Sequence, residues 1–228
     1  MKKLVVLSGA GISEESGIKT FRDSGGLWEG HDIMEVASPQ GWINNKEIVL
    51  DFYNKRRKQL FEVKPNSAHI ELAKLEQFFE VNVITQNVDD LHERAGSKKV
   101  VHLHGELLKA RSDKNEDYII EWEKDLKIGD NDPEGNQLRP HIVWFGENVP
   151  MLDKAIELTS MADILLIVGT SMQVYPAAGL IDFVAEEIPV FFVDPKPAVV
   201  SRQNLYVFEE KASTGIREVA NRLISDFL

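Results

Sequence analysis

The sequence predicts an α/β fold with a parallel sheet, helices on both of its faces, and a small lobe made of two insertions. Three observations predict it. Short apolar segments of strand length alternate with helical segments through the second half of the chain, which is the pattern of βαβ units. Three predicted strands end at Gly9, Gly169 and Asp194, so their carboxyl ends share one ligand-binding edge. Two stretches, 31–79 and 109–138, lack this alternation and fit insertions.

The composition is that of an ordinary folded protein, and it restricts the class of partner. Of the 228 residues, 43% are apolar and 28% are charged, which does not indicate disorder. The 26 basic and 37 acidic residues leave a net charge of -11. Nucleic-acid binding needs clustered Lys and Arg to neutralise phosphates, so we expect no nucleic-acid partner. Cationic partners such as lysine-rich peptides meet a more favourable field.

The chain contains no cysteine, which excludes disulfides, thiolate nucleophiles and cysteine-ligated zinc. The amino-terminal run MKKLVVLSGAG has two lysines before an apolar segment. This segment is shorter than the roughly 7 to 15 apolar residues of a signal peptide. No stretch approaches the length of a membrane span. We therefore expect a cytoplasmic protein without a membrane partner.

The first predicted strand, residues 3–7, runs directly into the segment SGAGISEESGI. Gly9 and Gly11 allow close backbone approach where a strand passes into a helix, as in sites that cradle a dinucleotide phosphate. The spacing is not GxGxxG, because the next glycine is Gly17, and no acidic residue follows a second strand at the expected distance. A plain strand-to-helix turn fits these residues equally well.

The glycine-rich segment TFRDSGGLWEG comes next and carries Phe21, Arg22 and Trp28. Aromatic and arginine residues on a loop suggest contact with a ligand. Phe21 and Trp28 would also serve to anchor such a loop to the core.

Residues 44–61 are predicted as a helix that carries the basic run KRRK from Lys55 onward. Tyr53 and Arg56 lie three residues apart on this helix and share a face. From the residues alone, Arg56 fits a solvated basic face together with Arg57 and Lys58.

The remaining elements follow from apolar periodicity and turn residues. Helices are predicted at residues 67–78, 151–161, 177–187 and 214–228. Strands are predicted at residues 81–85, 163–168, 189–193 and 205–208. The polar run GDNDPEGNQ marks the second insertion. We therefore assign 1–30, 80–108 and 139–228 to a large domain, and 31–79 and 109–138 to a small lobe.

The stretch VITQNVDDLHERAGSKKVVHLHGE, residues 83–106, places polar side chains at two strand ends. The first strand stops at three amide and acid residues, Gln86, Asn87 and Asp89. A second short strand ends at His104, which could act as a base near neutral pH. His102 alternates with His104 and shares its face, as in a metal pair, but no third ligand stands at a useful spacing. His92 fits a capping or packing role.

Five segments of the chain are, in order, GAGISEESGIKTFR, TQNVDDLHERAG, HLHGE, VWFGE and GTSMQVYPAAG. Together they resemble the sirtuin family, the NAD-dependent protein lysine deacylases, over nearly the whole chain. The resemblance implies a Rossmann-type large domain and a small lobe. It also implies NAD as the cofactor and acyl-lysine proteins or peptides as partners, both bound in the cleft between domain and lobe.

The resemblance implies that His104 is the general base. In the sirtuin mechanism the acyl oxygen attacks C1′ of the NAD ribose, nicotinamide leaves, and an alkylimidate forms. The base then takes a proton from the ribose hydroxyls so that the 2′-oxygen attacks the imidate carbon. The products are free lysine, nicotinamide and 2′-O-acyl-ADP-ribose. Gln86 and Asn87 are expected to bind the ribose hydroxyls and an ordered water, and Asp89 the nicotinamide carboxamide.

Further contacts are implied in the same way. Phe21 would shield the ribose from water, and Arg22 would serve the phosphates. Pyrophosphate would lie on the turn formed by Gly9, Ala10 and Gly11. The other cofactor-binding residues implied are Gly169, Thr170, Ser171, Asp194 and Ala212. The peptide backbone would pair with a strand-like segment that includes Val143, Phe145 and Gly146.

The segment FYNKRR resembles the part of desuccinylase-type sirtuins in which a Tyr and an Arg three residues later line the acyl pocket. A guanidinium fork and a Tyr hydroxyl both suit a carboxylate. We therefore expect Tyr53 and Arg56 to accept succinyl- and malonyl-lysine, with acetyl-lysine as a further substrate.

The chain departs from the family pattern in two ways. Sirtuins usually carry four zinc-binding cysteines in the small lobe, whereas residues 111–138 have none and Ser112 stands where the first would be. We therefore expect no zinc and a lobe held by packing and hydrogen bonds. Asp194 stands where the family commonly has Asn, and a carboxylate accepts from ribose hydroxyls but cannot donate to them.

Two alternative functions stay open. A sirtuin-like enzyme could transfer ADP-ribose to protein or hydrolyse NAD, or the chain could be a non-catalytic nucleotide-binding interaction module. Asn87, Asp89 and His104 together speak against the non-catalytic module. A monomer is favoured.

Overall fold

The computed structural model describes residues 1–18, 27–28, 30–198 and 202–228. Phe21 and Arg22, which were expected to contact the cofactor, lie outside the described residues. None of the helices in the described ranges combines the length and the apolar character needed to cross a membrane.

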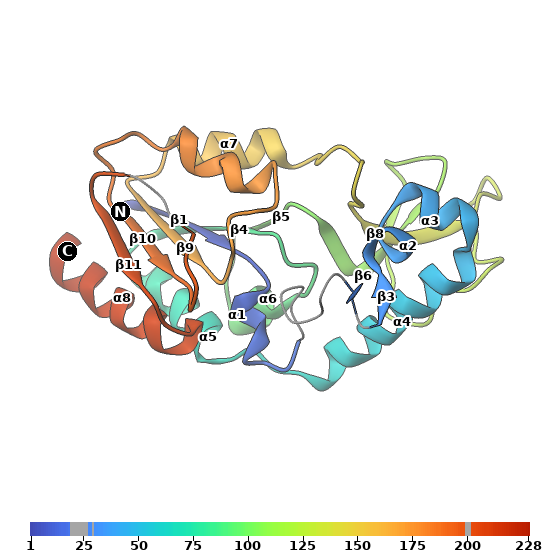
Figure 1. Cartoon of the computed structure of the whole chain (residues 1–228), viewed down its shortest axis with the longest axis horizontal. Helices are drawn as coiled ribbons and strands as arrows, with labels where there is room; N and C mark the ends of the chain where they lie inside the picture. Colours follow the sequence, from blue (N-terminus) through green and yellow to red (C-terminus); the bar gives the residue numbers. More distant parts are fainter. Residues whose placement is uncertain (19–26, 29, 199–201) are drawn as a thin grey trace.

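One parallel sheet of six strands organises the structure (Figure 1). Its strands, in spatial order, are β11 (Leu205–Phe208), β10 (Val190–Val193), β9 (Ile164–Val168), β1 (Lys3–Ser8), β4 (Glu80–Thr85) and β5 (Val100–His102). Every neighbouring pair is parallel. The central strands β1 and β9 are buried along nearly their whole length because both faces of the sheet are covered. This sheet confirms the predicted fold class.

Alternate side chains of the sheet enter two separate apolar clusters. Leu4 and Val6 of β1 face one side, where α5 (Ser67–Lys74) and α8 (Ala212–Phe227) pack. Val5 and Leu7 face the other side, where α7 (Leu152–Ser160) and the 3-10 helix η3 (Ala177–Phe183) pack. Successive side chains of a strand point to opposite faces of the sheet, so β1 contributes to both clusters and is buried on both faces.

Two of the predicted helices differ from the observed ones. The helix expected over 177–187 is the seven-residue η3, which ends where Val184 adopts an extended conformation. The helix expected over 67–78 divides into α5 and a short 3-10 helix, η2 (Leu75–Gln77). Apolar periodicity over so few residues does not distinguish 3-10 from α-helical turns. The other predicted helices and the sheet strands named above match within two residues.

A second region combines short helices with a three-stranded antiparallel sheet. Its helices are α2 (Ile33–Val36), α3 (Pro39–Asn44) and α4 (Lys46–Glu62). Each begins after a side chain that accepts a hydrogen bond from a first-turn N–H, namely Asp32, Ser38 and Asn45. The sheet has the order β7 (Ile119–Glu121), β6 (Gly105–Ser112), β8 (Leu138–Ile142). Figure 1 shows this region at the end of the elongated molecule opposite β10 and β11.

The remaining elements are short. They are α1 (Gly11–Glu14), α6 (Leu91–Ala95) and the strand pair β2 (Leu27–Trp28) and β3 (His31–Asp32).

Two elements cross the predicted domain boundaries, and a third packs against the region to which it was not assigned. β6 continues unbroken from Gly105 to Ser112, across the boundary at 108. β8 straddles the boundary at 139. α5 was expected in the small lobe but packs with α8 against the six-stranded sheet. The division into a large domain and a small lobe stays a prediction. If it holds, its boundaries would lie at the ends of β6, β8 and α5 and not within β6 and β8.

Candidate active site

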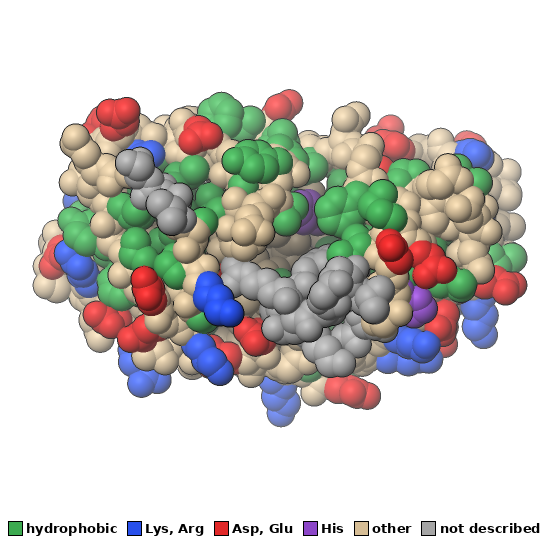
Figure 2. Space-filling view, in the orientation of Figure 1, with side chains coloured by type: hydrophobic (Ala, Val, Ile, Leu, Met, Phe, Trp, Pro, Cys, Tyr) green, Lys and Arg blue, Asp and Glu red, His purple; other side chains and the backbone are tan. Residues whose placement is uncertain are grey.

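Polar residues gather at the carboxyl ends of β4, β9 and β10. The Gln86 side-chain amide donates to the Thr170 hydroxyl at 3.1 Å. Asp194 is buried, and its Oδ1 accepts the Lys196 N–H at 2.8 Å. This is the edge at which open α/β sheets bind ligands. Figure 2 shows a hollow near the middle of the face in view, with a histidine side chain at its edge.

Ser171 and Ala212 were also expected at the cofactor. Ser171 is partly exposed next to Thr170. Ala212 is buried at the first residue of α8. Because Ala212 has no polar side chain, its contact with a cofactor would be through the backbone.

Gly9, Gly11 and Gly169 pack backbone against backbone where β1 and β9 end. The Gly11 N–H donates to the Gly169 carbonyl at 2.8 Å, and a Cβ on Gly11 would lie 2.8 Å from the Gly169 Cα. Gly169 has a φ of +63°, which side chains rarely adopt. Because the Gly9 N–H donates to the Val168 carbonyl as well, a phosphate on this turn would bind other N–H groups, such as that of Ala10.

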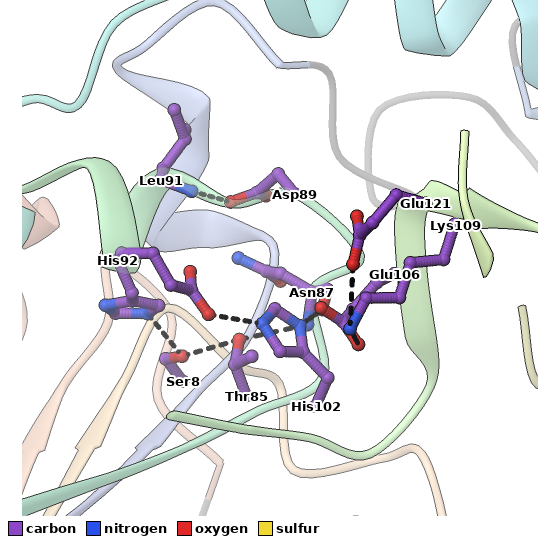
Figure 3. A network of polar contacts seen from close by, with 11 residues as sticks. Ser8, Thr85, Asn87, Asp89, Leu91, His92, His102, Glu106, Lys109 and Glu121 are labelled. Carbon is purple, nitrogen blue, oxygen red and sulfur yellow. Dashed lines mark hydrogen bonds and ion pairs between the residues drawn. The ribbon is translucent and has the colours of Figure 1, made fainter. Parts of the chain in front are cut away.

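A chain of hydrogen bonds holds Asn87 and Asp89 against α1. The Asn87 side-chain amide donates to the Ser13 hydroxyl at 3.1 Å, and that hydroxyl donates to the Asp89 carboxylate at 3.0 Å. The Leu91 N–H donates to the other Asp89 oxygen at 3.2 Å (Figure 3). Burial raises the pKa of Asp89, and the bonds from Leu91 and Ser13 partly oppose the shift. The structure therefore brings together two predicted residues and adds Ser13, which lies in the segment GAGISEESGIKTFR but was given no role from the sequence.

His104 follows β5 and has one ring nitrogen held in place. Its Nδ1 lies 3.0 Å from the Gln86 carbonyl oxygen. A carbonyl oxygen can only accept, so Nδ1 carries the proton and Nε2 keeps its lone pair. Burial lowers the pKa of His104, and the bond to Gln86 opposes this only in part. The imidazole is therefore neutral at neutral pH, and Nε2 can accept a proton as a general base does.

His102 has the opposite arrangement. Its Nδ1 lies 3.0 Å from the Asn87 carbonyl oxygen, and its Nε2 lies 2.8 Å from the Glu93 carboxylate (Figure 3). Burial disfavours the charged form, but the hydrogen bond and the charge of Glu93 outweigh it and raise the pKa of His102. With both nitrogens donating, His102 has no lone pair for a base or a metal. His102 and His104 instead hold two consecutive carbonyl groups, those of Asn87 and Gln86.

His92 lies beneath the site and is fully buried, in line with the expected packing role. Its Nε2 lies 2.9 Å from the Ser8 hydroxyl, which donates to the Thr85 hydroxyl at 2.9 Å (Figure 3). The Thr85 oxygen accepts the Asn87 N–H at 3.0 Å. The ring of His69 lies edge-on to that of His92 at 5.0 Å between centroids. His69 carries no signal in the sequence, because its neighbour is 23 positions away in the chain.

The sequence pattern of the Sir2 family matches residues 9–176. The chain belongs to the Sir2 family. A Helicobacter pylori protein called an NAD-dependent protein deacylase is 57% identical over 225 residues, which cover 98% of this chain and 96% of that protein. A Bacteroides thetaiotaomicron protein of the same name is 52% identical over 231 residues, covering 98% and 99%. A solved complex of a Sir2 homologue with NAD superposes with a TM-score of 0.88 at 38% identity, covering 98% and 90%.

In this Sir2 chain, the two residues expected in the acyl pocket lie on α4. Tyr53 is fully buried, and its hydroxyl accepts a hydrogen bond from the Trp144 indole N–H at 3.0 Å. Burial raises the pKa of Tyr53, so the hydroxyl stays protonated. Arg56 is partly exposed, and its guanidinium lies 5.7 Å from the centre of the Phe52 ring.

The basic run on α4 is not a uniformly solvated face. Arg57 is 1% exposed, and it donates from Nε to the Leu107 carbonyl at 3.0 Å and from Nη1 to the Asn54 side chain at 2.7 Å. Lys58 is exposed and pairs with Asp125 at 3.0 Å. The expectation of a solvated face is wrong for Arg57, because a guanidinium can be buried where acceptors meet its N–H groups.

The segment after β8 leads back to the site. The Val143 N–H donates to the His104 carbonyl at 2.9 Å, and the Phe145 N–H donates to the Ala37 carbonyl at 3.0 Å. Phe145 and Gly146 are both exposed, and Gly146 has a φ of +91°. Because two N–H groups already have partners, pairing with a peptide backbone would use other groups of this segment.

Hydrogen bonds shape the region in which sirtuins usually carry zinc-binding cysteines. The Ser112 hydroxyl accepts the N–H groups of the residues two and three positions later, at 3.2 and 3.1 Å. The Asp132 carboxylate accepts the N–H groups of Glu134 and Asn136 at 2.9 and 2.8 Å. Hydrogen bonds from Ser112 and Asn136 lower the pKa of Asp132 to about 2. Across the described ranges, no three His, Asp or Glu side chains are placed to hold a metal ion.

An ion cluster joins β6, β8 and the segment after β8. Glu147 accepts from Arg111 at 3.0 Å and from both terminal nitrogens of Arg139 at 2.8 Å. Its carboxylate also accepts the Trp144 N–H at 2.8 Å. The Arg139 guanidinium lies 3.6 Å from the centre of the Trp144 ring. The spacing of these residues along the chain did not indicate the cluster, since Arg111 and Glu147 are 36 positions apart.

Proposed function

We propose that this protein is an NAD-dependent protein lysine deacylase that removes acetyl groups and also acidic acyl groups such as succinyl and malonyl. The observation that carries the proposal is the neutral imidazole of His104, which keeps Nε2 as a base at the carboxyl edge of the sheet. Relatives that match almost the full chain are named as NAD-dependent protein deacylases, which supports the same activity here.

The residues at the strand ends fit NAD. Gln86 and Thr170 offer amide and hydroxyl groups to ribose or phosphate oxygens, and Asp194 offers a carboxylate to ribose hydroxyls. Gly9 and Gly11 leave no side chain between the sheet edge and a phosphate. When bound, NAD supplies the ribose carbon that accepts the acyl oxygen as nicotinamide leaves.

The side chains of the site then have separate tasks. His104 would accept a proton from a ribose hydroxyl at Nε2, while the Gln86 carbonyl keeps the ring oriented through Nδ1. Asn87, held by Ser13, would orient the ribose hydroxyls and a water. Asp89 would accept from the nicotinamide carboxamide. The products would be free lysine, nicotinamide and 2′-O-acyl-ADP-ribose.

Tyr53 and Arg56 support the acidic part of the proposed substrate range. They lie on the same face of α4, three residues apart. A guanidinium can give a carboxylate two parallel charge-assisted hydrogen bonds, and a Tyr hydroxyl can give it a third. An acetyl group offers no carboxylate to these donors.

Release of nicotinamide, followed by mass spectrometry, tests the proposed activity. The protein is incubated with NAD alone, and with NAD plus an acetyl-lysine or a succinyl-lysine peptide of the same sequence. Release that requires acyl peptide supports deacylation. Release without peptide would indicate NAD hydrolysis instead, and no release under any condition would indicate a binding module.

A further inference from the structure

Trp144 connects the ion cluster of the small sheet to Tyr53. Its backbone N–H donates to Glu147 at 2.8 Å, and its ring lies against the Arg139 guanidinium at 3.6 Å. Arg139 also donates to the Ile142 carbonyl at 3.0 Å, at the end of β8. Trp144 is 2% exposed. The position of the indole is therefore fixed by the backbone bond to Glu147, by the Arg139 guanidinium on its ring and by burial.

The indole N–H of Trp144 decides how the Tyr53 hydroxyl can be used. An indole nitrogen can only donate, so the Tyr53 oxygen accepts at 3.0 Å. A phenol hydroxyl has a single hydrogen, and that hydrogen is left to donate to a different partner. Arg56, one turn further along α4, carries donors alone and cannot be the acceptor.

We propose that Trp144 is a positioning residue that sets Tyr53 as a hydrogen-bond donor and thereby favours acyl groups that end in a carboxylate. The inference rests on the proposed function, since it requires Tyr53 and Arg56 to meet the acyl group. A carboxylate can only accept, so it suits a site that presents two donors. The methyl end of an acetyl group accepts no hydrogen bond. Turnover of acetyl-lysine peptide should therefore not depend on the direction of the Tyr53 hydroxyl hydrogen.

The ratio of kcat/KM for succinyl-lysine and acetyl-lysine peptides of one sequence tests this role. Trp144→Phe keeps an aromatic ring against Arg139 and removes the indole N–H. We expect the ratio to fall about 3- to 10-fold, which is the range for one net hydrogen bond. Because both activities are measured on one preparation, a smaller folded fraction lowers both and leaves the ratio unchanged.

A double-mutant cycle with Tyr53→Phe shows whether the effect passes through the hydroxyl. Tyr53→Phe should lower the ratio by itself, and adding Trp144→Phe to it should lower the ratio no further. Trp42→Phe is the matched control. Trp42 is buried in the same cluster with its ring 5.9 Å from that of Trp144, and its Nε1 has no hydrogen-bond partner among the described residues. This control should leave the ratio as in the wild type.

The possible results separate the inference from the proposed function. If the wild-type enzyme prefers succinyl-lysine and the ratio is unchanged in Trp144→Phe, the positioning role is overturned. The proposed function is not affected by that result. Additive effects in the cycle, or an equal fall in Trp42→Phe, would overturn it as well. A wild-type enzyme that removes acetyl but not succinyl groups would contradict the proposed acyl class, and with it the inference.

Discussion

Two histidines that stand two residues apart have opposite pKa shifts because their Nε2 atoms have different surroundings. Both Nδ1 atoms lie 3.0 Å from a backbone carbonyl oxygen, that of Asn87 for His102 and that of Gln86 for His104. The Nε2 of His102 meets Glu93, which raises its pKa against burial, whereas burial lowers the pKa of His104. The neighbouring carboxylate therefore favours the protonated form of His102, whereas His104 keeps Nε2 available as a base.

Replacing His104 by Gln tests the base. Gln retains a polar side chain but has no group that accepts a proton near neutral pH. We expect kcat for deacylation to fall about 10²- to 10⁴-fold, the usual contribution of a general base, with NAD affinity changed little. Steady-state assays and calorimetric titration with NAD measure the two quantities. Turnover within threefold of the wild type would exclude His104 as the base.

Arg56→Ala tests the acidic part of the substrate range. We expect desuccinylation to fall at least about tenfold, because a hydrogen bond to a charged group contributes about 1.5 to 3 kcal/mol, while deacetylation is retained. Lys58→Ala is the matched control, since Lys58 belongs to the same basic run but is exposed and pairs with Asp125. An equal loss of both activities in Arg56→Ala would contradict the proposal that Arg56 binds the carboxylate of acidic acyl groups.

At the scale of elements, one buried set of side chains couples α5 and α6 to the central strands. His69 of α5 packs on His92 of α6, which bonds Ser8 of β1, and Ser8 bonds Thr85 of β4. Burial lowers the pKa of His69 to about 4 and that of His92 well below its ordinary value. The active-site segment that starts at Gln86 therefore rests on neutral, desolvated histidines.

Stability should consequently depend on pH through His69. Between about pH 6.5 and pH 4 the unfolded chain binds this proton and the folded protein does not, so the free energy of unfolding falls as the pH decreases through that range. From pH 7.5 to pH 5.0 the contribution of His69 amounts to about 2 kcal/mol. Over the same pH interval, the free energy of unfolding of His69→Leu should fall by about 2 kcal/mol less than that of the wild type. Urea denaturation at the two pH values measures this difference. The same pH dependence in both proteins would contradict this coupling.

At the scale of the whole molecule, two differently built regions meet at the site. The six-stranded sheet has apolar layers on both faces. The three-stranded sheet and α2 to α4 share a third apolar cluster, to which the Arg111, Arg139 and Glu147 cluster is attached. Both regions contribute to the site, since His104 stands between β5 and β6 and its carbonyl binds Val143 after β8.

The second region should keep its structure without a metal. The chain has no cysteine, and thiolates are the usual ligands of structural zinc. We expect less than about 0.1 zinc per chain after purification, and a shift in Tm with excess chelator below about 1 °C, because chelation lowers stability only where a metal binds the folded state. Elemental analysis and calorimetry measure both. One zinc per chain, or loss of activity with the chelator, would refute this expectation.

The sequence by itself determined the parallel sheet and the place of Gln86, Asn87, Asp89 and His104 at strand ends. Continuous apolar runs are typical of parallel strands that are buried on both faces, and the polar residues of the site directly follow such runs. The tertiary structure decided which of these groups carry charge and which are fixed. The burial of Arg57 and the bond from Trp144 to Tyr53, 91 positions apart, depend on partners that only folding brings together. Desolvation and hydrogen bonding act through space, and the spacing of residues along the chain does not encode those neighbours.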